Sequence, residues 1–369
     1  MRDVTLDRLR LARSEGVGPQ TWHRLMARFG GDAGAALAAM PGFPASGRPL
    51  VPASVSATER ERDALLANGA HLIFAGDPGY PPLLALLPNA PAMLAVLGDP
   101  ALLSARGAAV VGARAASAGG RRIAESLSQA LSEAGVTIVS GLARGIDAAA
   151  HTGALRGPAR TIAVVPGGLD TPYPPENAYL QDRIAAEGGA VVAEAPLGMA
   201  PLARHFPARN RIVAGLALGV VVVEAARSSG TLITARLALE AGREIFAVPG
   251  SPLDPRSAGA NDLIRQGAHL TETAEDVLEH LPEVPHDGPL FAPRTEAPPP
   301  WAAPPPAPAA SVEAAQLLEL LGDTPLPVDE VLRRCHLSAP VARALLLDLE
   351  LEGRIETQPG NRVSLVRPG

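Results

Sequence analysis

Residues 219–251 read GVVVVEAARSSGTLITARLALEAGREIFAVPGS. Two short apolar runs, GVVVVEAA and EIFAVPGS, flank a helix-like segment, TLITARLALEAG, which follows a Ser/Gly turn. Continuous apolar runs are typical of strands buried on both faces, and a helix between two of them indicates a βαβ crossover. The stretch therefore predicts a parallel sheet covered by helices.

The same alternation extends toward the N-terminus. Further apolar runs are HLIFAGD, AAVVGAR, VTIVSGLA, RTIAVVPGG and AVVAEAP, and segments such as GGRRIAESLSQALSEAG separate most of them. Strands alternating with helices are typical of α/β folds. We expect residues 70–283 to form one doubly wound α/β domain with a mostly parallel sheet.

Different patterns flank this domain. Residues 1–69 have helical periodicity, interrupted by GVGP, which indicates a small helix-hairpin-helix or SAM-like domain. The turn offers backbone N–H groups to a phosphate, or is a plain turn without a ligand. Residues 284–310 are rich in Pro and Ala, as in extended linkers.

Residues 311–369 regain helical periodicity and end in a strand pair within RIETQPGNRVSLV, which predicts a winged-helix domain. In the segment at the recognition-helix position, Arg343 is the only basic residue, and it lies among the acidic Asp348, Glu350 and Glu352. DNA-reading helices usually carry more positive charge. This favours protein contact or packing over DNA contact for this helix.

Composition excludes several classes of site. The 369 residues carry a net charge of −6 and no lysine, so neither a Schiff-base lysine nor a P-loop lysine is available. The single Cys335 excludes an intrachain disulfide and a thiolate metal cluster, and fits a reducing cytosol. We expect no signal peptide, no membrane span and a cytoplasmic location, because the N-terminus is charged and no apolar run is long enough.

Four Gly- or Ser-bearing loops follow predicted strands, and in an open parallel sheet they converge at the carboxyl edge, where ligands bind. Two of them carry an arginine, Arg114 or Arg144, and helix N-termini preceded by such turns attract anions. The candidate anion-binding residues are Gly112, Ser117, Ser140, Gly141, Gly145, Gly167, Gly168, Ser229, Gly230 and Thr231. The dinucleotide fingerprint G-x-G-x-x-G is absent.

The segment HFPARNRIVAGLA, residues 205–217, lies just before the strand GVVVVEAA. We expect its helix to start near Arg209, with Asn210 and Arg211 also in the first turn. Arginines can bind phosphates there, and Phe206 can stack on a base, a combination typical of single-strand nucleic-acid binding. Alternatively, Phe206 packs under the helix and Arg211 pairs with a glutamate, Glu194 or Glu224.

The motifs VGARAASAGG, SGLARGIDAAAHTGAL, TIAVVPGGLDTPYPPEN, EAPLG, HFPARNRIVAGLA, VVVVEAARSSGTLITARLALEAGREIFAVPGS and GANDLIRQGAHL occur in this order. Together they resemble the DprA/Smf family of DNA-processing proteins of natural transformation, over about residues 70–280. The resemblance implies an extended Rossmann fold that binds single-stranded DNA without sequence preference and forms a homodimer. It also implies protection of incoming strands and loading of RecA on them, with displacement of single-strand-binding protein, and neither catalysis, cofactor nor metal.

Carried over motif by motif, the resemblance assigns DNA contacts to Arg114, Arg144, Phe206, Arg209, Asn210 and Arg211. At position 144 many relatives have lysine, so the contact geometry can differ here.

Two other functions fit parts of the pattern. A nucleotide N-glycosidase would need a carboxylate beside the ribose, for which Asp147, Glu194 and Glu224 are candidates. However, VPGGLDTP departs from the PGGxGT motif of such hydrolases. An adaptor would use the winged helix and linker to recruit a partner.

Overall fold

The structure is a computed structural model that describes residues 3–283, apart from residues 43, 46 and 47, and shorter stretches between 317 and 365. The predicted linker, 284–310, lies outside the described residues. So do Arg343, Asp348 and Glu352 of the predicted recognition helix.

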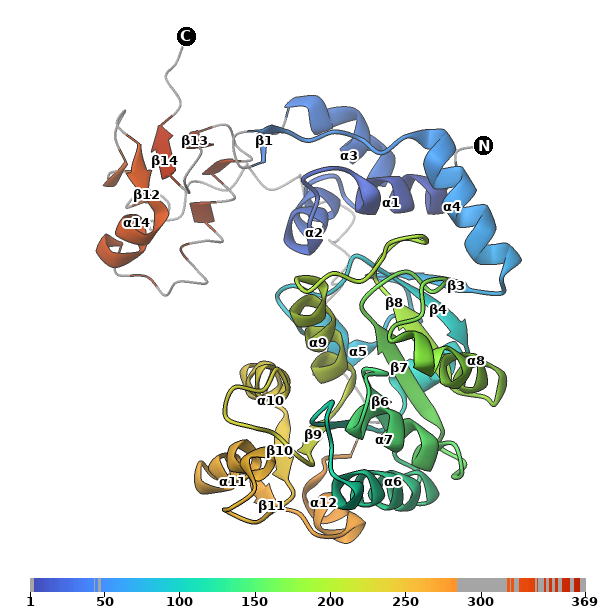
Figure 1. Ribbon diagram of the computed structural model, residues 1–369. Helices are drawn as coiled ribbons and strands as arrows, with labels where there is room; N and C mark the ends of the chain where they lie inside the picture. The colour runs from blue at the N-terminus through green and yellow to red at the C-terminus, as the bar shows by residue number, and fades with distance from the viewer. Residues whose placement is uncertain are drawn as a thin grey trace, which may run out of the picture. The chain divides into compact units, whose positions relative to one another are not determined.

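A nine-stranded sheet forms the centre of the α/β domain, in the order β11-β10-β9-β5-β6-β7-β8-β4-β3 (Figure 1). The strands from β11 to β8 are mutually parallel, whereas β4 runs antiparallel to both β8 and β3. The strands are β3 (His71–Phe74), β4 (Met93–Gly98), β5 (Gly107–Val111), β6 (Thr137–Ser140), β7 (Thr161–Val165), β8 (Ala190–Ala193), β9 (Gly219–Val222), β10 (Glu244–Ala247) and β11 (His269–Leu270). The predicted α/β fold class, a doubly wound and mostly parallel sheet, is confirmed.

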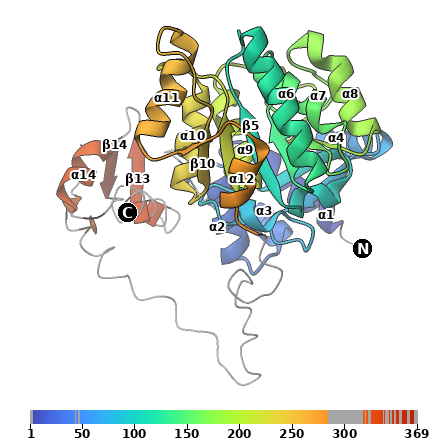
Figure 2. The same cartoon turned by 90° about the horizontal axis from the view of Figure 1, so that it is seen from below.

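Helices cover both faces of the sheet (Figures 1 and 2). On β9, Val220 and Val222 pack into the cluster that holds α9, α10 and α11, while Val221 packs into the cluster that holds α6, α7 and α12. The helices are α5 (Pro82–Ala85), α6 (Ala118–Glu133), α7 (Ile146–Ala154), α8 (Ala178–Ala186), α9 (His205–Leu216), α10 (Thr231–Glu240), α11 (Ala258–Arg265) and α12 (Ala274–His280), with 3-10 turns η2 (Pro100–Ser104), η3 (Pro175–Asn177) and η4 (Pro255–Ser257). Each buried valine contributes about 1.5–3 kcal/mol, so the apolar run of 219–223 stabilises both layers at once.

The direction of winding reverses at β5. The chain leaves β5 through α6 to β6 on one side, and β9 pairs with β5 on the other side. Ligands of open α/β sheets bind at such a switch point, beyond the carboxyl ends of the strands. The loops after β5 and β9 therefore define the place to look for a site.

The sequence prediction missed β4 and β11. The segment PAMLAVLGDP carries an apolar run, but only the single-turn α5 lies between it and β3, and the two strands pair antiparallel, so the βαβ pattern did not single it out. Strand β11 has only two residues, too few to show a period.

The N-terminal residues form α1 (Val4–Arg13), α2 (Pro19–Arg28), α3 (Ala33–Ala39) and α4 (Val55–Ala67), with a 3-10 turn, η1 (Met40–Gly42), and two short strands, β1 (Pro44–Ala45) and β2 (Arg48–Pro49). The predicted break at GVGP lies between α1 and α2, and Pro19 takes the first position of α2, where its missing N–H costs nothing. Two amides beside this turn are already bonded: Glu15 N to Val51 O at 2.9 Å and Val17 N to Ser14 O at 3.1 Å.

Toward the C-terminus, β12 (Leu326–Pro327), α14 (Val328–Arg334), β13 (Ile355–Gln358) and β14 (Arg362–Leu365) are described. Strands β13 and β14 pair antiparallel, which confirms the predicted strand pair. Cys335 is buried in this domain's apolar cluster, with Val331 and Ile355.

Candidate nucleic-acid interface

A cavity of about 750 Å³ lies at the switch point of the sheet. It is lined by the loops after β5 and β6, by one face of α9, and by the turn that precedes α10. Of the predicted site residues, it brings together Gly112, Arg114, Gly141, Phe206, Arg209, Asn210, Ser229, Gly230 and Thr231. We call this cavity the switch-point pocket.

Phe206 is half-buried at the wall of the pocket. The exposed Arg114 guanidinium carbon lies 4.8 Å from the centre of its ring, and Tyr173 meets the ring edge-on, with the centroids 5.6 Å apart. A cation over an aromatic ring contributes about 0.5–1 kcal/mol at an exposed site. The ring and the cation are thus held together at one surface, where an unpaired nucleotide could use both.

Helix α9 begins at His205, four residues before the predicted start. The predicted start was wrong: it left Pro207 outside the helix, whereas a proline is tolerated in the first turn. Arg209 and Arg211 consequently lie in the second turn. Residues that are two positions apart in a helix are separated by about 200° around its axis, so Arg209 and Arg211 cannot face the same surface.

Arg209 lies beneath the pocket and is only 6% exposed. Its Nη1 donates to the carbonyl oxygen of Val164 at 2.8 Å, and a Cβ at Gly141 would stand 1.7 Å from the same nitrogen. Burial lowers the pKa of Arg209 to about 10, and the nearby Asp147 opposes this shift, so the side chain stays charged at neutral pH. Arg209 supplies positive potential from the pocket floor rather than an exposed, mobile cation.

Arg211 is absent from the pocket lining. Its Nη2 donates to both carboxylate oxygens of Glu194, at 2.7 and 2.6 Å, and the side chain is 7% exposed. Of the two interpretations left open by the sequence for this residue, the structure shows pairing with Glu194. A buried arginine that donates to both oxygens of a carboxylate stabilises the fold and does not reach a ligand at the surface.

The N-terminus of α6 is occupied by a carboxylate of the chain itself. Ser117 caps the helix by accepting from Gly120 N at 2.8 Å, and its own N and Oγ donate to Glu224 at 2.9 and 2.5 Å. A Cβ on Gly120 would collide with that carboxylate. Glu224 therefore takes the position that the sequence analysis gave to a bound phosphate, and Ser117 does not line the pocket.

In the loop after β6, backbone N–H groups are likewise hydrogen-bonded by a carboxylate of the chain itself. Asp147 accepts from Gly141 N at 3.2 Å and from Ala143 N at 3.4 Å. Burial raises the pKa of Asp147, while Arg209 and the backbone amides of Gly141, Ala143 and Gly112 oppose that shift. The amides of this loop hold an internal carboxylate, so they are not free for a phosphate.

His151 fixes the same loop from below. Its Nε2 accepts from Leu142 N at 3.3 Å, and its Nδ1 lies 2.8 Å from Thr161 Oγ1, which donates to Ile138 O. Thr161 Oγ1 then accepts from Nδ1–H, so the neutral tautomer satisfies all these contacts. Burial lowers the pKa of His151 to about 3, and Arg209 adds to the effect.

Several other predicted anion-binding residues serve the fold. Ser140 is buried and donates to Val110 O at 2.6 Å. Gly167 and Gly168 are buried against residues 196–201, where a Cβ would stand 2.7 Å from Met199 O or 2.5 Å from Pro196 O. Neither glycine lines the pocket.

The N-terminus of α10 differs from those of α6 and α7. Its N-cap is Gly230, which has no side chain, and its first turn contains no acidic residue. Ser229 Oγ donates to Thr231 Oγ1 at 2.9 Å, and both residues line the pocket. Thr231 N is bonded to Ser229 Oγ at 3.2 Å, and Leu232 N and Ile233 N are bonded to Ser229 O and Gly230 O, each at 3.1 Å. This end of the pocket therefore attracts an anion through the helix field, which no carboxylate of its own first turn neutralises, and not through free amides.

Arg144 lies at the rim and not in the pocket lining. It is exposed and forms an ion pair with Glu176, which lowers the pKa of the Glu176 carboxyl. Its neighbours diverge: Ala143 lines the switch-point pocket, whereas Gly145 lines a second groove. Gly145 has a φ of +77°, and a Cβ there would stand 2.3 Å from Ala113 O, which explains the glycine.

Two pocket residues with aromatic or cationic side chains, Tyr173 and Arg256, were not predicted from the sequence. Tyr173 lies in PGGLDTPYPPEN and packs on Phe206, and Arg256 lines the pocket while paired with Asp254 at 2.8 Å. Aromatic residues make up only 3% of the chain, so a tyrosine in a predicted loop was the signal by which Tyr173 could have been found. Arg256 follows an Asp-Pro turn 25 residues after Thr231, and nothing in the local pattern connects it to the site.

Within the described residues, no group of three or more His, Cys, Asp or Glu side chains is arranged to hold a metal ion. In the same part of the chain, no helix is both long and apolar enough to span a bilayer.

Sequence comparisons match the whole domain series. The profile of the family described as DNA recombination-mediator protein A matches residues 71–282. Residues 2–64 match the DprA-like N-terminal HHH domain, and residues 301–361 match the DprA winged helix domain. Protein Smf of Escherichia coli K12 is 43% identical over 304 residues, which are 80% of this chain and 78% of that protein.

Solved structures give the same answer. DNA processing protein A from Streptococcus pneumoniae superposes with a TM-score of 0.63 at 36% identity, covering 77% of this chain and all of that chain. DNA processing protein A from Helicobacter pylori, studied for its single-stranded DNA binding mode, superposes with a TM-score of 0.51 at 28% identity, covering 57% of this chain and 94% of the other.

Proposed function

The chain belongs to the DNA recombination-mediator protein A family, and from this premise we propose that it binds single-stranded DNA in the switch-point pocket. The observation that carries the proposal is the pairing of Arg114 with Phe206 at a cavity that also contains the N-terminus of α10. A phosphate and an adjacent base can be bound there together.

Each wall of the pocket has a different part in binding. Arg114 takes a phosphate by charge-assisted hydrogen bonds, and residues 229–231 offer a second position for an anion. Phe206 takes the face of a base, a contact of about 1–3 kcal/mol. Asn210 lines the pocket, and its side-chain amide makes no hydrogen bond within the described residues. The side chain is therefore free for a base edge or a phosphate oxygen.

Binding of this kind does not depend on sequence. Every base has a π-face, and every nucleotide has a phosphate, so stacking and ion pairing read neither base identity nor order. Arg209, held under the floor, adds a field that is present before the strand arrives. Affinity should fall with salt, since each neutralised phosphate releases counterions.

We further propose that the bound strand is protected and that RecA is loaded on it with displacement of single-strand-binding protein. The test is RecA filament formation on single-stranded DNA that single-strand-binding protein has coated. Wild-type chain should accelerate nucleation, and Arg114→Ala should not. Acceleration by both to the same extent would show that loading does not pass through the pocket.

We propose that the working form is a homodimer that uses the edge of the sheet at β11. Leu270 on β11 is 51% exposed and Leu239 on α10 is 57% exposed, and a free strand edge pairs readily with another chain. Sedimentation should report a dimer that Leu270→Arg converts to a monomer. A wild-type monomer at micromolar concentration would contradict this assignment.

We propose that the chain is not an enzyme. Each of the three candidate carboxylates is engaged: Glu224 with Ser117, Glu194 with Arg211, and Asp147 with backbone amides. A base-release assay with nucleoside monophosphates is the test. Turnover that Asp147→Asn abolishes would overturn this part of the proposal.

A further inference from the structure

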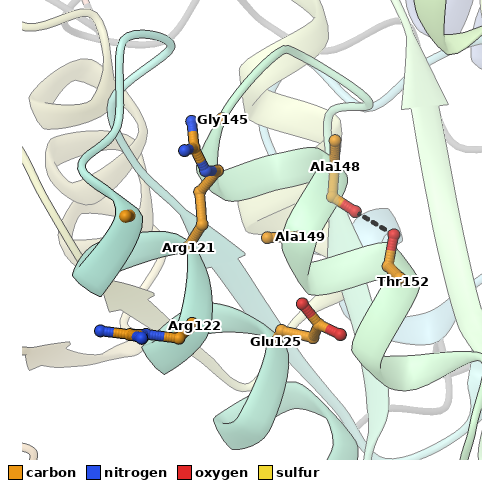
Figure 3. A pocket seen from close by; sticks show the side chains of 8 residues that line it. Arg121, Arg122, Glu125, Gly145, Ala148, Ala149 and Thr152 are labelled. Atoms are coloured by element: carbon orange, nitrogen blue, oxygen red, sulfur yellow. Dashed lines mark hydrogen bonds between the residues drawn. The ribbon is translucent and has the colours of Figure 1, made fainter.

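A second groove lies between the N-terminal ends of α6 and α7 and has a volume of about 440 Å³ (Figure 3). Its floor consists of small side chains, among them Ala118, Ala148 and Ala149. Arg121 and Arg122 stand on its α6 side. In Figure 3 Arg121 extends toward the turn that carries Gly145, and Arg122 points away from α7.

Within the part of the chain that the structure describes, the two arginines have no acidic partner. Among the described residues neither Arg121 nor Arg122 forms an ion pair, and Arg121 Nη1 donates only to Ala116 O, at 3.3 Å. The acid in this groove, Glu125, is already paired with Arg156. Both arginines lie within the first two turns of α6 (Ala118–Glu133).

The groove and the switch-point pocket are separated by a thin ridge. The loop of Ala113 and Arg114 forms it together with the loop of Ala143 to Gly145. Their backbones touch, since a Cβ on Gly145 would stand 2.3 Å from Ala113 O and 2.6 Å from Arg114 O. Arg144, exposed, lies on this ridge between a pocket residue and a groove residue.

From these observations we infer that the α6–α7 groove carries the sugar-phosphate backbone of a bound single strand after it leaves the switch-point pocket. This rests on the proposed function and extends its site. The strand crosses the ridge at Arg144, whose pairing with Glu176 is exchanged for a phosphate, and its next phosphates meet Arg121 and Arg122. The groove offers no aromatic side chain, so it binds phosphates without stacking bases.

Oligonucleotide length separates this inference from the proposed function. Oligo-dT of roughly 4 and roughly 16 nucleotides brackets the usual range of single-strand site sizes. For the double variant Arg121→Ala/Arg122→Ala, affinity for the long strand should fall about 25-fold at 0.1 M salt, worked from about 0.7 counterions per phosphate. Affinity for the short strand should not change, because it occupies only the pocket.

The matched control is Arg183→Ala/Arg236→Ala, which also removes two arginines but on α8 and α10, where each is paired with a glutamate. It should leave both affinities within about twofold. Thermal unfolding of each variant shows whether it is folded, and Arg122→Glu alone gives a second test that spares the Arg121 hydrogen bond.

The outcomes are distinct. Loss of affinity for the long strand only supports the groove. Unchanged affinity, or equal loss for both lengths, overturns it, even when Arg114→Ala weakens both and the pocket stands. If wild-type chain binds neither strand, the proposed function fails first and the groove with it.

Discussion

Removal of the Arg114 guanidinium is the sharpest single perturbation of the pocket. The side chain is exposed and makes no ion pair within the described residues, so Arg114→Ala costs the fold little beyond its contact with Phe206 at 4.8 Å. Loss of one phosphate contact lowers the salt slope by about 0.7, which corresponds to about fivefold in affinity at 0.1 M salt. At about 0.5 M salt the same loss should shrink to less than about twofold.

Fluorescence anisotropy with a labelled oligo-dT, repeated over a salt series, measures both quantities. Arg183→Ala is the control, because it removes one arginine from α8, paired with Glu187, away from the pocket lining. Arg114→Lys should retain most of the slope but less of the affinity, since lysine lacks the bidentate fork. An Arg114→Ala variant with wild-type affinity and salt slope would show that Arg114 contacts no phosphate of the bound strand.

Three further results are expected. Phe206→Ala should weaken single-strand binding by about 1–3 kcal/mol in the same anisotropy assay, and Phe206→Tyr should not. Gly141→Ala should lower the free energy of unfolding by about 1–3 kcal/mol or more in thermal melts, because the new Cβ meets Arg209, whereas Gly230→Ala, with no atom within 4 Å, should be neutral. Acidification from pH 6.5 to 5 should cost about 2 kcal/mol through His151, because its folded pKa of about 3 lies below the unfolded value and the unfolded chain binds the proton first; denaturant titrations of His151→Gln should lack that loss.

The sheet could be predicted from the sequence because buried parallel strands appear as continuous apolar runs. Runs such as GVVVV face helices on both sides, and the Gly/Ser turns mark where helices start. The antiparallel β4 did not fit the pattern, since only the single-turn α5 lies between it and β3. The start of α9 escaped it because a proline in a first turn resembles a helix stop.

The chemistry of the site was harder to predict, because a sequence shows charges and not their partners. Arg211 is neutralised by Glu194, 17 positions away, and Arg209 is bonded to a carbonyl 45 positions away. Only the three-dimensional arrangement distinguishes these internal arginines from Arg114, which reaches the surface. The resemblance to the family pointed to a segment that lines the pocket, but it could not assign each side chain a direction.

The glycine-rich loops show the same limit. Glu224 and Asp147 supply from within the anion that the N-terminus of α6 and the loop before α7 would otherwise attract. With those two positions filled from within, α10, which has Gly230 as its N-cap and no acidic residue in its first turn, is left to attract an anion at the pocket. This gives a physical reason for a pocket suited to a passing strand rather than to a mononucleotide held at its phosphates.

The most direct measurement is photo-crosslinking of oligo-dT that carries a reactive thymine, with the crosslinked residues mapped by mass spectrometry. If the strand lies in the switch-point pocket, crosslinks are expected at Phe206 and Tyr173, with others in residues 112–114 and 228–231. Crosslinks confined to residues 3–58 or to residues 317–365 would contradict it.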